Sequence, residues 1–457
     1  MSVPIDRTRP PQSGEPRTTG FPAFERTRLA NGLELLLLPR AGVPRVEIAL
    51  VLPAGGDRNP LELPGLASLT ASLVDEGTDR RPGPRIAAEV ERLGAGLSTR
   101  ADWNAAELEV DLLSKDFDTG LELLAELARE PVFPEEEIER LRRLALTELL
   151  RRRDRPAILA EEALARALYR GTPYAELLLG SEGSLARLDR TSIAEFHAEH
   201  FRPLGAALVA VGPFEPAAAT EKVHSLFGDW PSTAPPEPPR REPPPDSGRR
   251  VIVVDRPKAA QTELRLGHVG IPRDHPDRNR LFLVNAALGG KFTSRINLNL
   301  RERHGYTYGA SSRFVDRRGP GPFVVSTAVA TPVAGAAARE VLVELERIRA
   351  APLAEEELEE TRSYLLGVFP YTLQTAKGLL GRLEDLAVYG LPNDHYERTL
   401  DELASSRADE LLEVTRRHIR PEALVVVAVG PAAELEPQLS PLGPVEVLEL
   451  PGQPAPG

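Results

Sequence analysis

Two stretches of this chain repeat one another closely. HFRPLGAALVAVGP occupies residues 200–213, and HIRPEALVVVAVGP occupies residues 418–431, which lie 218 positions later. A second pair follows in the same order, since PEEEIER at 134–140 returns as AEEELEE at 354–360, 220 positions later. Self-similarity at a nearly constant separation indicates a repeated structural unit. The chain is therefore predicted to be an internal duplication of two units, each of roughly 200 residues.

Each unit has the pattern of strands, then amphipathic helices, then a closing apolar strand. The predicted strands are residues 33–39, 45–53 and 206–211 in the first unit and 251–254, 262–269 and 424–429 in the second. An apolar run without alternation is typical of a strand that is covered on both faces. The sequence therefore predicts an α+β fold made of two homologous α+β domains.

A proline-rich segment separates the two units. WPSTAPPEPPRREPPPDSGRR, residues 230–250, cannot form a helix or a central strand because proline lacks the backbone N–H and has a fixed φ. We expect it to run extended on the surface as a linker. The predicted division is a flexible tail at 1–22, an N-terminal domain at 23–229, the linker at 230–250 and a C-terminal domain at 251–457.

The composition excludes several classes of function. A formal charge of -12 and a pI near 5.4 argue against nucleic acid or an anionic membrane as the main partner, since both attract basic proteins. The chain has no cysteine, which excludes disulfides, thiolate metal sites and thiol nucleophiles. The polar N-terminus has no signal-peptide pattern, so a cytoplasmic location is expected, or a periplasmic one if a leader has been trimmed.

Residues 63–78, LPGLASLTASLVDEGT, resemble the zinc-binding helix of the pitrilysin and insulinase family of metallopeptidases. In that family the run reads Gly-Leu-Ala-His-x-x-Glu-His, followed by Gly-Thr. Two imidazoles one helical turn apart bind zinc, and the Glu takes a proton from the zinc-bound water. By this resemblance Ser68, Ala71 and Ser72 replace the first His, the Glu and the second His. A serine hydroxyl is a poor zinc ligand, and alanine cannot act as a base.

The distribution of histidines points the same way. None of the eight histidines lies in the first 196 residues, so a histidine-ligated zinc site built from the N-terminal body alone is excluded. The resemblance places Glu148 at the family's third ligand position. Glu148 is equally well interpreted as a structural acid that pairs with an arginine such as Arg151 or Arg152. A single carboxylate cannot hold zinc, so no metal is expected to bind this chain.

The second unit keeps another family motif. Residues 288–314, LGGKFTSRINLNLRERHGYTYGASSRF, resemble the family's Gly-rich turn, helix and Gly-x-x-Tyr segment. The resemblance implies that Arg301 and Tyr308 contact the substrate at the scissile bond. A phenol and a guanidinium suit this role because they stabilise the negative charge that develops on a carbonyl oxygen. The alternative is a surface ion pair and a packed ring.

Three further positions have two interpretations each. Gly289 and Gly290 match the start of the Gly-rich loop of the non-catalytic subunit of mitochondrial processing peptidase, although two such glycines are also a common turn. His197 and His200 lie three apart on one predicted helix and could ligate a metal, but solvated polar positions are the favoured interpretation. Gly305 is expected to allow a sharp exit from the helix that carries Arg301.

The resemblance covers residues 24–431 and implies a function. It describes one half of a clamshell, a non-catalytic subunit without zinc peptidase activity alone. Its partner would be a homologous subunit that carries His-x-x-Glu-His and the zinc, and the pair would cut peptides or unfolded segments. The alternatives are an inert structural subunit like the core subunits of the respiratory cytochrome complex, and a homodimer that only binds peptides.

Overall fold

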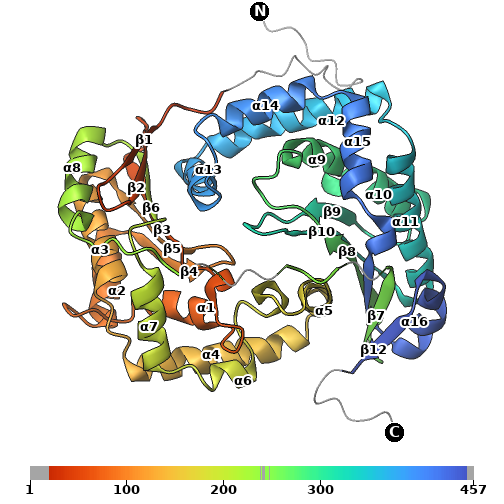
Figure 1. Cartoon of the computed structure of the whole chain (residues 1–457), viewed down its shortest axis with the longest axis horizontal. Coiled ribbons are helices and arrows are strands. Elements are labelled where there is room, and N and C mark those ends of the chain that lie inside the picture. The colour runs from red at the N-terminus through yellow and green to blue at the C-terminus, as the bar shows by residue number, and fades with distance from the viewer. Residues whose placement is uncertain (1–19, 237, 239–241, 246–247, 450–457) are drawn as a thin grey trace, which may run out of the picture.

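The computed structural model in Figure 1 describes residues 20–236, 238, 242–245 and 248–449. It contains two six-stranded mixed sheets with helices packed over them, one sheet in each half of the chain. The first sheet comprises β1 (Glu25–Arg28), β2 (Glu34–Pro39), β3 (Arg45–Leu52), β4 (Gly96–Ala101), β5 (Ala106–Leu113) and β6 (Ala207–Gly212). The second sheet comprises β7 (Arg250–Asp255), β8 (Gln261–Val269), β9 (Ala310–Phe314), β10 (Pro322–Ala330), β11 (Val425–Gly430) and β12 (Val445–Leu448). The α+β prediction is confirmed.

The two sheets share one strand order, which confirms the duplication. The first sheet runs β1-β2-β6-β3-β5-β4, and the second runs β12-β7-β11-β8-β10-β9. In each, the closing strand of the unit lies in the middle, parallel to one neighbour and antiparallel to the other. Only the first edge differs, because β1 is antiparallel to β2 whereas β12 is parallel to β7. That edge is filled by the N-terminal part of the chain in one sheet and by the C-terminal part in the other.

Helices cover both faces of each sheet. In the first half the helices are α1 (Leu66–Ala71), α2 (Gly83–Leu93), α3 (Phe117–Arg129), α4 (Glu135–Arg153), α5 (Pro156–Tyr169), α6 (Glu182–Leu185), α7 (Arg190–His200) and α8 (Pro216–Phe227). In the second half they are α9 (Arg278–Asn285), α10 (Arg295–Asn297), α11 (Ala334–Ala350), α12 (Glu355–Val368), α13 (Ala376–Val388), α14 (His395–Ser405), α15 (Ala408–His418) and α16 (Ala432–Leu439). Every residue of β6 and β11 is buried, as their unbroken apolar runs predict. None of the described helices is long and apolar enough to span a membrane.

One helix of each half packs on the sheet of the other half. Helix α13 lies against the first sheet, where its leucines meet the apolar side chains of β2, β3 and β6. Helix α5 lies in the same way against β7, β8 and β11 of the second sheet. The two helices begin 220 residues apart, like the second sequence repeat. Figure 1 shows α13 reaching from the blue half toward the red and orange strands. This exchange joins the halves through two apolar cores.

All six predicted strands are present, each within one residue of its predicted ends. The described part of the linker has no helix or strand before β7 and is largely exposed, in agreement with its prolines. Residues 1–19 of the predicted tail lie outside the described residues. Phe21, also assigned to the tail, is buried and stacks on Tyr396, so ordered packing begins before residue 23. The remaining domain boundaries stay a prediction.

Candidate functional site

Helix α1 holds the positions that correspond to the zinc motif. The N–H of Ser72 donates to the carbonyl of Ser68 at 3.1 Å, so the two serines lie one turn apart on one face. Both are partly exposed, whereas Ala71 is fully buried. Gly65 precedes the helix at φ +96°, where an added Cβ would lie 2.8 Å from the carbonyl oxygen of Leu179. The backbone of a ligand-bearing helix is thus present, but no side chain on this turn can bind zinc.

Glu148 lies on α4, which packs beside α1. Its side chain is 36% exposed, and its carboxylate lies 4.0 Å from the Arg155 guanidinium. Glu148 thus faces an arginine, as one of its two interpretations expects, but this arginine is Arg155, and Arg152 pairs with Glu162 at 2.8 Å. An arginine from the turn after α4 reaches back because the helix ends at Arg153. A role for Glu148 as a former ligand stays a prediction.

Arg301 and Tyr308 flank the turn that leads into β9. Arg301 lies in a π-helical turn, η5 (Leu298–Arg303), with its guanidinium 4.6 Å from the centre of the Phe292 ring. Glu302 pairs with the same guanidinium at 3.3 Å. Tyr308 is 94% exposed, the most exposed large apolar side chain of the described residues. The arginine is therefore held in place while the phenol is free to meet another molecule.

Glycines shape both ends of this segment. Gly305 has φ +62°, a left-handed conformation that ends the helical turn as predicted. Gly289 and Gly290 end another π-helical turn, η4 (Ala286–Gly290), and neither has a positive φ. A Cβ on Gly289 would lie 2.5 Å from the backbone nitrogen of Ser312 on β9. Gly289 thus permits close packing of the helix on the sheet, whereas a Cβ on Gly290 would meet the side chain of Asn285 at 2.9 Å. Substrate handling by the two glycines stays a prediction.

Two family models cover most of the folded chain. Residues 36–182 match the model described as Insulinase (Peptidase family M16), and residues 187–365 match the model described as Peptidase M16 inactive domain. The chain belongs to the peptidase M16 family. The resemblance to insulinase-type peptidases is thereby confirmed. The predicted zinc-motif positions Ser68, Ala71 and Ser72 lie in the part of the chain that matches the Insulinase model.

Relatives of this M16 chain carry different descriptions. An uncharacterized zinc protease of Rickettsia felis is 24% identical over 63% of this chain and 69% of its own length. The non-peptidase homolog YmxG of Helicobacter pylori is 22% identical over 82% of this chain and 87% of its own length. Bovine cytochrome b-c1 complex subunit 1 is 24% identical over 59% of this chain and 56% of its own length. The crystal structure of a peptidase M16 inactive domain from Pseudomonas fluorescens superposes with a TM-score of 0.84, at 24% identity, over 90% of this chain and 98% of that one.

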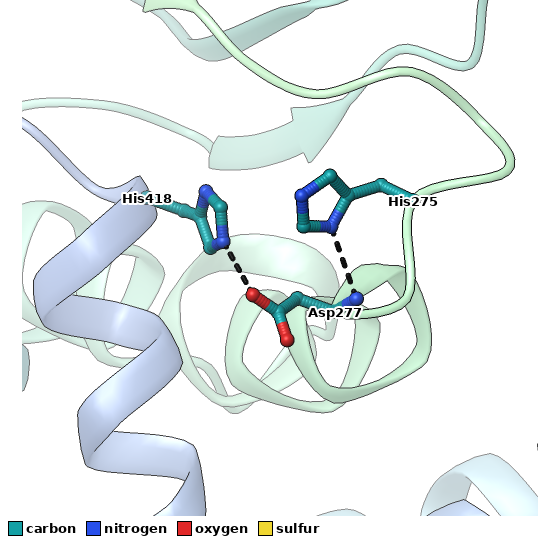
Figure 2. A group of neighbouring side chains, drawn as sticks. All are labelled: His275, Asp277 and His418. Carbon is teal, nitrogen blue, oxygen red and sulfur yellow. Dashed lines mark hydrogen bonds and ion pairs between the residues drawn. The ribbon is translucent and has the colours of Figure 1, made fainter.

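One cluster of this M16 chain has the side chains of a metal site, but hydrogen bonds within the protein already occupy several of its ligand atoms. His275, Asp277 and His418 offer ligand atoms within 4.8 Å of one another (Figure 2). The backbone N–H of Asp277 donates to His275 Nδ1 at 3.0 Å, so that nitrogen bears no proton. Nε2 of the neutral ring must then carry the proton and offers no lone pair to a metal. Asp277 Oδ2 also accepts from His418 Nε2 at 2.6 Å and from Arg417 at 2.7 Å.

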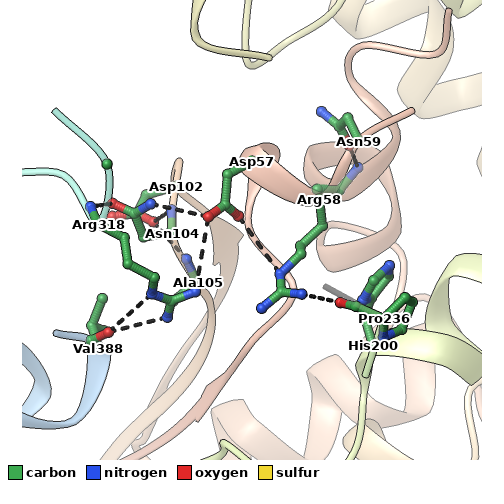
Figure 3. Close-up of polar contacts among 12 residues, drawn as sticks. Asp57, Arg58, Asn59, Asp102, Asn104, Ala105, His200, Pro236, Arg318 and Val388 are labelled. Atoms are coloured by element: carbon green, nitrogen blue, oxygen red, sulfur yellow. Dashed lines mark hydrogen bonds and ion pairs between the residues drawn. The ribbon is translucent and has the colours of Figure 1, made fainter. Parts of the chain in front are cut away.

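A second polar group lies where the two halves meet. Asp57, in the short helix η1 (Gly56–Arg58), accepts from Asn104 Nδ2 at 3.2 Å (Figure 3). Asn104 accepts from the backbone N–H of Arg318 at 3.0 Å, and the Arg318 guanidinium donates to the carbonyl of Val388 at 3.1 Å. Burial raises the pKa of Asp57. The Arg318 guanidinium, 3.8 Å from the carboxylate, partly offsets this rise. The group ties the first half to the β9–β10 hairpin and to α13.

These two groups share a short sequence but differ in their contacts, since Asp277 accepts from His418 and Arg417 whereas Asp57 accepts from Asn104. Asp-Arg-Asn occurs at 57–59 and again at 277–279, 220 residues later, each time at the start of a helical segment. A histidine also lies near each group. His200 and His418 are the first residues of the repeated stretches 200–213 and 418–431, and His200 lies beside Arg58 (Figure 3). The repeated Asp-Arg-Asn is the sequence signal that marks both groups. The group around Asp57 lies where the halves meet, and its contacts with Asn104 and Arg318 give it a structural role.

The interpretation of His197 and His200 as solvated positions is wrong. His197 Nε2 hydrogen-bonds the carbonyl of Ala128 at 2.9 Å, and its ring packs between Phe133 and Phe201. His200 is buried against Phe196. Burial lowers the pKa of each imidazole to about 4. Both histidines belong to the core because α7 presents this face to the first sheet's helical layer.

Proposed function

We propose that this M16 chain is the zinc-less subunit of a two-chain metallopeptidase and that Arg301 and Tyr308 bind the scissile region of the peptide. The observation that carries the proposal is the exposure of Tyr308, a 94% exposed phenol seven residues after an arginine that is held in place. Tyrosine is enriched where proteins meet a partner, since its ring is apolar and its hydroxyl is polar. A homologous partner would supply the zinc, which activates water for attack on the peptide carbonyl.

The two side chains have complementary tasks in this proposal. The Tyr308 hydroxyl donates a hydrogen bond to the carbonyl oxygen as negative charge develops on it. The Arg301 guanidinium, supported by Phe292 and Glu302, orients the peptide and adds positive charge. Gly305 fixes the direction in which the chain leaves the helical turn, and with it the position of Tyr308. The chain would thus contribute to turnover without holding a metal.

The first test is reconstitution with a zinc-bearing homologue. We expect Tyr308→Phe to lower turnover of a quenched peptide on the order of 100-fold, as loss of one oxyanion donor does, while assembly of the two chains is unchanged. Arg301→Ala should lower turnover as well. Tyr364→Phe is the matched control, because Tyr364 is also exposed, at 42%, but lies on α12. Wild-type turnover in both Tyr308→Phe and Arg301→Ala would contradict the proposal.

The chain alone provides a second test. We expect the purified chain to retain no zinc after dialysis and to leave the quenched peptide uncut. Cleavage by the chain alone that a metal chelator abolishes would contradict a zinc-less role. Zinc content measured on the same sample separates a bound metal from a contaminating peptidase.

A structural role is the second candidate. It is supported by the similarity to a subunit of the cytochrome b-c1 complex and to a non-peptidase homolog. Under this candidate the chain would assemble with a partner, or with itself as a peptide-binding homodimer, and neither Arg301 nor Tyr308 would affect turnover. Binding of a labelled peptide by the chain alone, at equal affinity in wild type and Tyr308→Phe, would favour it.

A further inference from the structure

Three buried carboxylates meet beneath the exchanged helix α13. Glu107 and Glu109 lie on β5 of the first sheet, and Glu384 lies on α13 of the second half. They are 8%, 5% and 7% exposed, and each offers an oxygen within 4.8 Å of the others. We call these three residues the carboxyl cluster. Acidic side chains are seldom buried this deeply without partners, so the charges around the cluster decide its state.

Two cations face the carboxyl cluster. Arg100 on β4 pairs with Glu107 and, at 2.5 Å, with Glu109. Lys377, near the start of α13, pairs with Glu109. Glu384 Oε1 is buried and has no hydrogen-bond partner among the described residues. Three carboxylates against two cations leave one negative charge unbalanced, and a proton on Glu384 removes it.

The remaining groups around Glu384 add negative charge. Asp385 follows it on α13, and burial raises the pKa of that acid too. Glu47 on β3 also depends on Lys377 for a counter-charge, and burial raises its pKa. Burial raises the pKa of Glu107 as well, which Arg100 opposes. The other nearby cations face other acids, since Arg45 faces Glu47, and Arg273 and Arg382 face Asp385.

The other exchanged helix shows that the fold does not require these charges. The 220-residue separation of α5 and α13 places Leu164 at the position of Glu384. Leu164 is buried among apolar side chains on the second sheet. Each of these two helices packs on the sheet of the opposite half. The corresponding position is apolar on α5 and acidic on α13. A buried acid at this position of α13 is therefore not a requirement of the fold.

We propose that the carboxyl cluster makes the attachment of α13 to the first sheet sensitive to pH, so that α13 is held more firmly when Glu384 carries a proton. Because α13 is the element that the second half contributes to the first, its attachment determines how firmly the two halves are joined. A rise in pH ionises Glu384 and loosens the join. The inference is independent of any peptidase role.

The direction follows from proton linkage. Burial, with the nearby charge of Glu107, raises the pKa of Glu384 from its ordinary value of 4.5 to about 7. With α13 attached, the group keeps its proton up to near neutral pH, whereas with α13 detached it loses the proton at much lower pH. The attachment is therefore strongest at low pH and weakens as the pH rises from 4.5 to 7 and somewhat beyond. Between pH 6 and pH 8.5 the opening equilibrium should rise about tenfold.

Amide hydrogen exchange of the full chain tests the proposal. After correction for intrinsic rates, we expect amides of α13 to exchange about tenfold faster at pH 8.5 than at pH 6, with no such change in α5. Helix α5 is the internal control because it makes the same kind of join without a buried acid. Glu384→Gln, which keeps the shape of the protonated acid, should abolish the difference.

Two results would overturn the proposal. One is an equal response to pH in α5 and α13 of the wild-type chain, which needs no variant and so does not depend on how Glu384→Gln folds. The other is a Glu384→Gln chain whose α13 keeps the wild-type response. The pKa values near 4 of the buried histidines His197, His200, His268 and His395 place their titration below this pH range.

Discussion

The imidazole of His268 shows how completely a buried polar side chain can be fixed by its neighbours. His268 is fully buried on β8; its Nδ1 meets the carbonyl of Val269 at 2.9 Å, and its Nε2 accepts from the backbone N–H of Arg420 at 3.2 Å. Both ring nitrogens are used by the neutral form, and a second proton would face an N–H donor. Burial lowers the pKa of His268 to about 4. The ring therefore resists protonation until the solution is strongly acidic.

This residue gives a prediction for acid stability. The pKa of His268 lies below its ordinary value of 6.5, so the unfolded chain binds more protons between pH 6.5 and pH 4, and stability is lost as the pH falls through that range. The contribution of one such group is about 3 kcal/mol. We expect the fall in unfolding free energy from pH 7 to pH 4 to be smaller by that amount in His268→Asn. An NMR titration that gives His268 a pKa of 6 or above would contradict the argument.

At the scale of elements, the left-handed cap at Gly305 connects the Arg301 turn to Tyr308. A side chain at φ +62° is strained, so we expect Gly305→Ala to lower the free energy of unfolding by about 1 kcal/mol. Gly367 on α12 is the matched control, since an added Cβ there meets nothing within 4 Å and its φ is not positive. Gly367→Ala should stabilise by about 0.5–1 kcal/mol. Thermal unfolding of both variants measures the contrast, and equal effects would show that Gly305 is not a required cap.

The elements also show what the sequence could and could not foretell. Six of the twelve described strands were predictable because each is a short apolar run, and the repeat at 200–213 and 418–431 indicated that the two units are alike. The order of the strands within each sheet was not predicted. The exchange of α5 and α13 was not predictable, because the apolar face of a helix does not indicate which of two sheets the helix packs on. The assignment of Ser68, Ala71 and Ser72 to the zinc-motif positions comes from the family resemblance and stays a prediction. The burial of His197 could not be predicted, because its partners Ala128 and Phe133 are distant in sequence.

At the scale of the whole molecule, the exchange makes each half depend on the other. Without α13 the first sheet would expose the apolar face formed by Leu36, Leu38, Val51, Val209 and Val211. Without α5 the second sheet would expose Ile252, Val254, Val324, Val427 and Val429 in the same way. Exposed apolar sheet faces of this kind promote association. The two sequence units are therefore homologous in topology without being independent in folding.

A chain cut within the proline-rich segment 230–250 tests this dependence. We expect each half expressed alone to be insoluble or unfolded, and the two halves expressed together to copurify as a folded complex. Leu383→Asp on α13 should prevent that association, because it places a charge in the apolar core over the first sheet. Leu150→Asp on α4 is the control, since Leu150 is 54% exposed. The contrary result is that each half alone is soluble and shows a cooperative unfolding transition. In that case each half is a self-sufficient domain that does not need the exchanged helix. If only the pair folds, the apolar contacts of α5 and α13 with the opposite sheets are required for either half to fold.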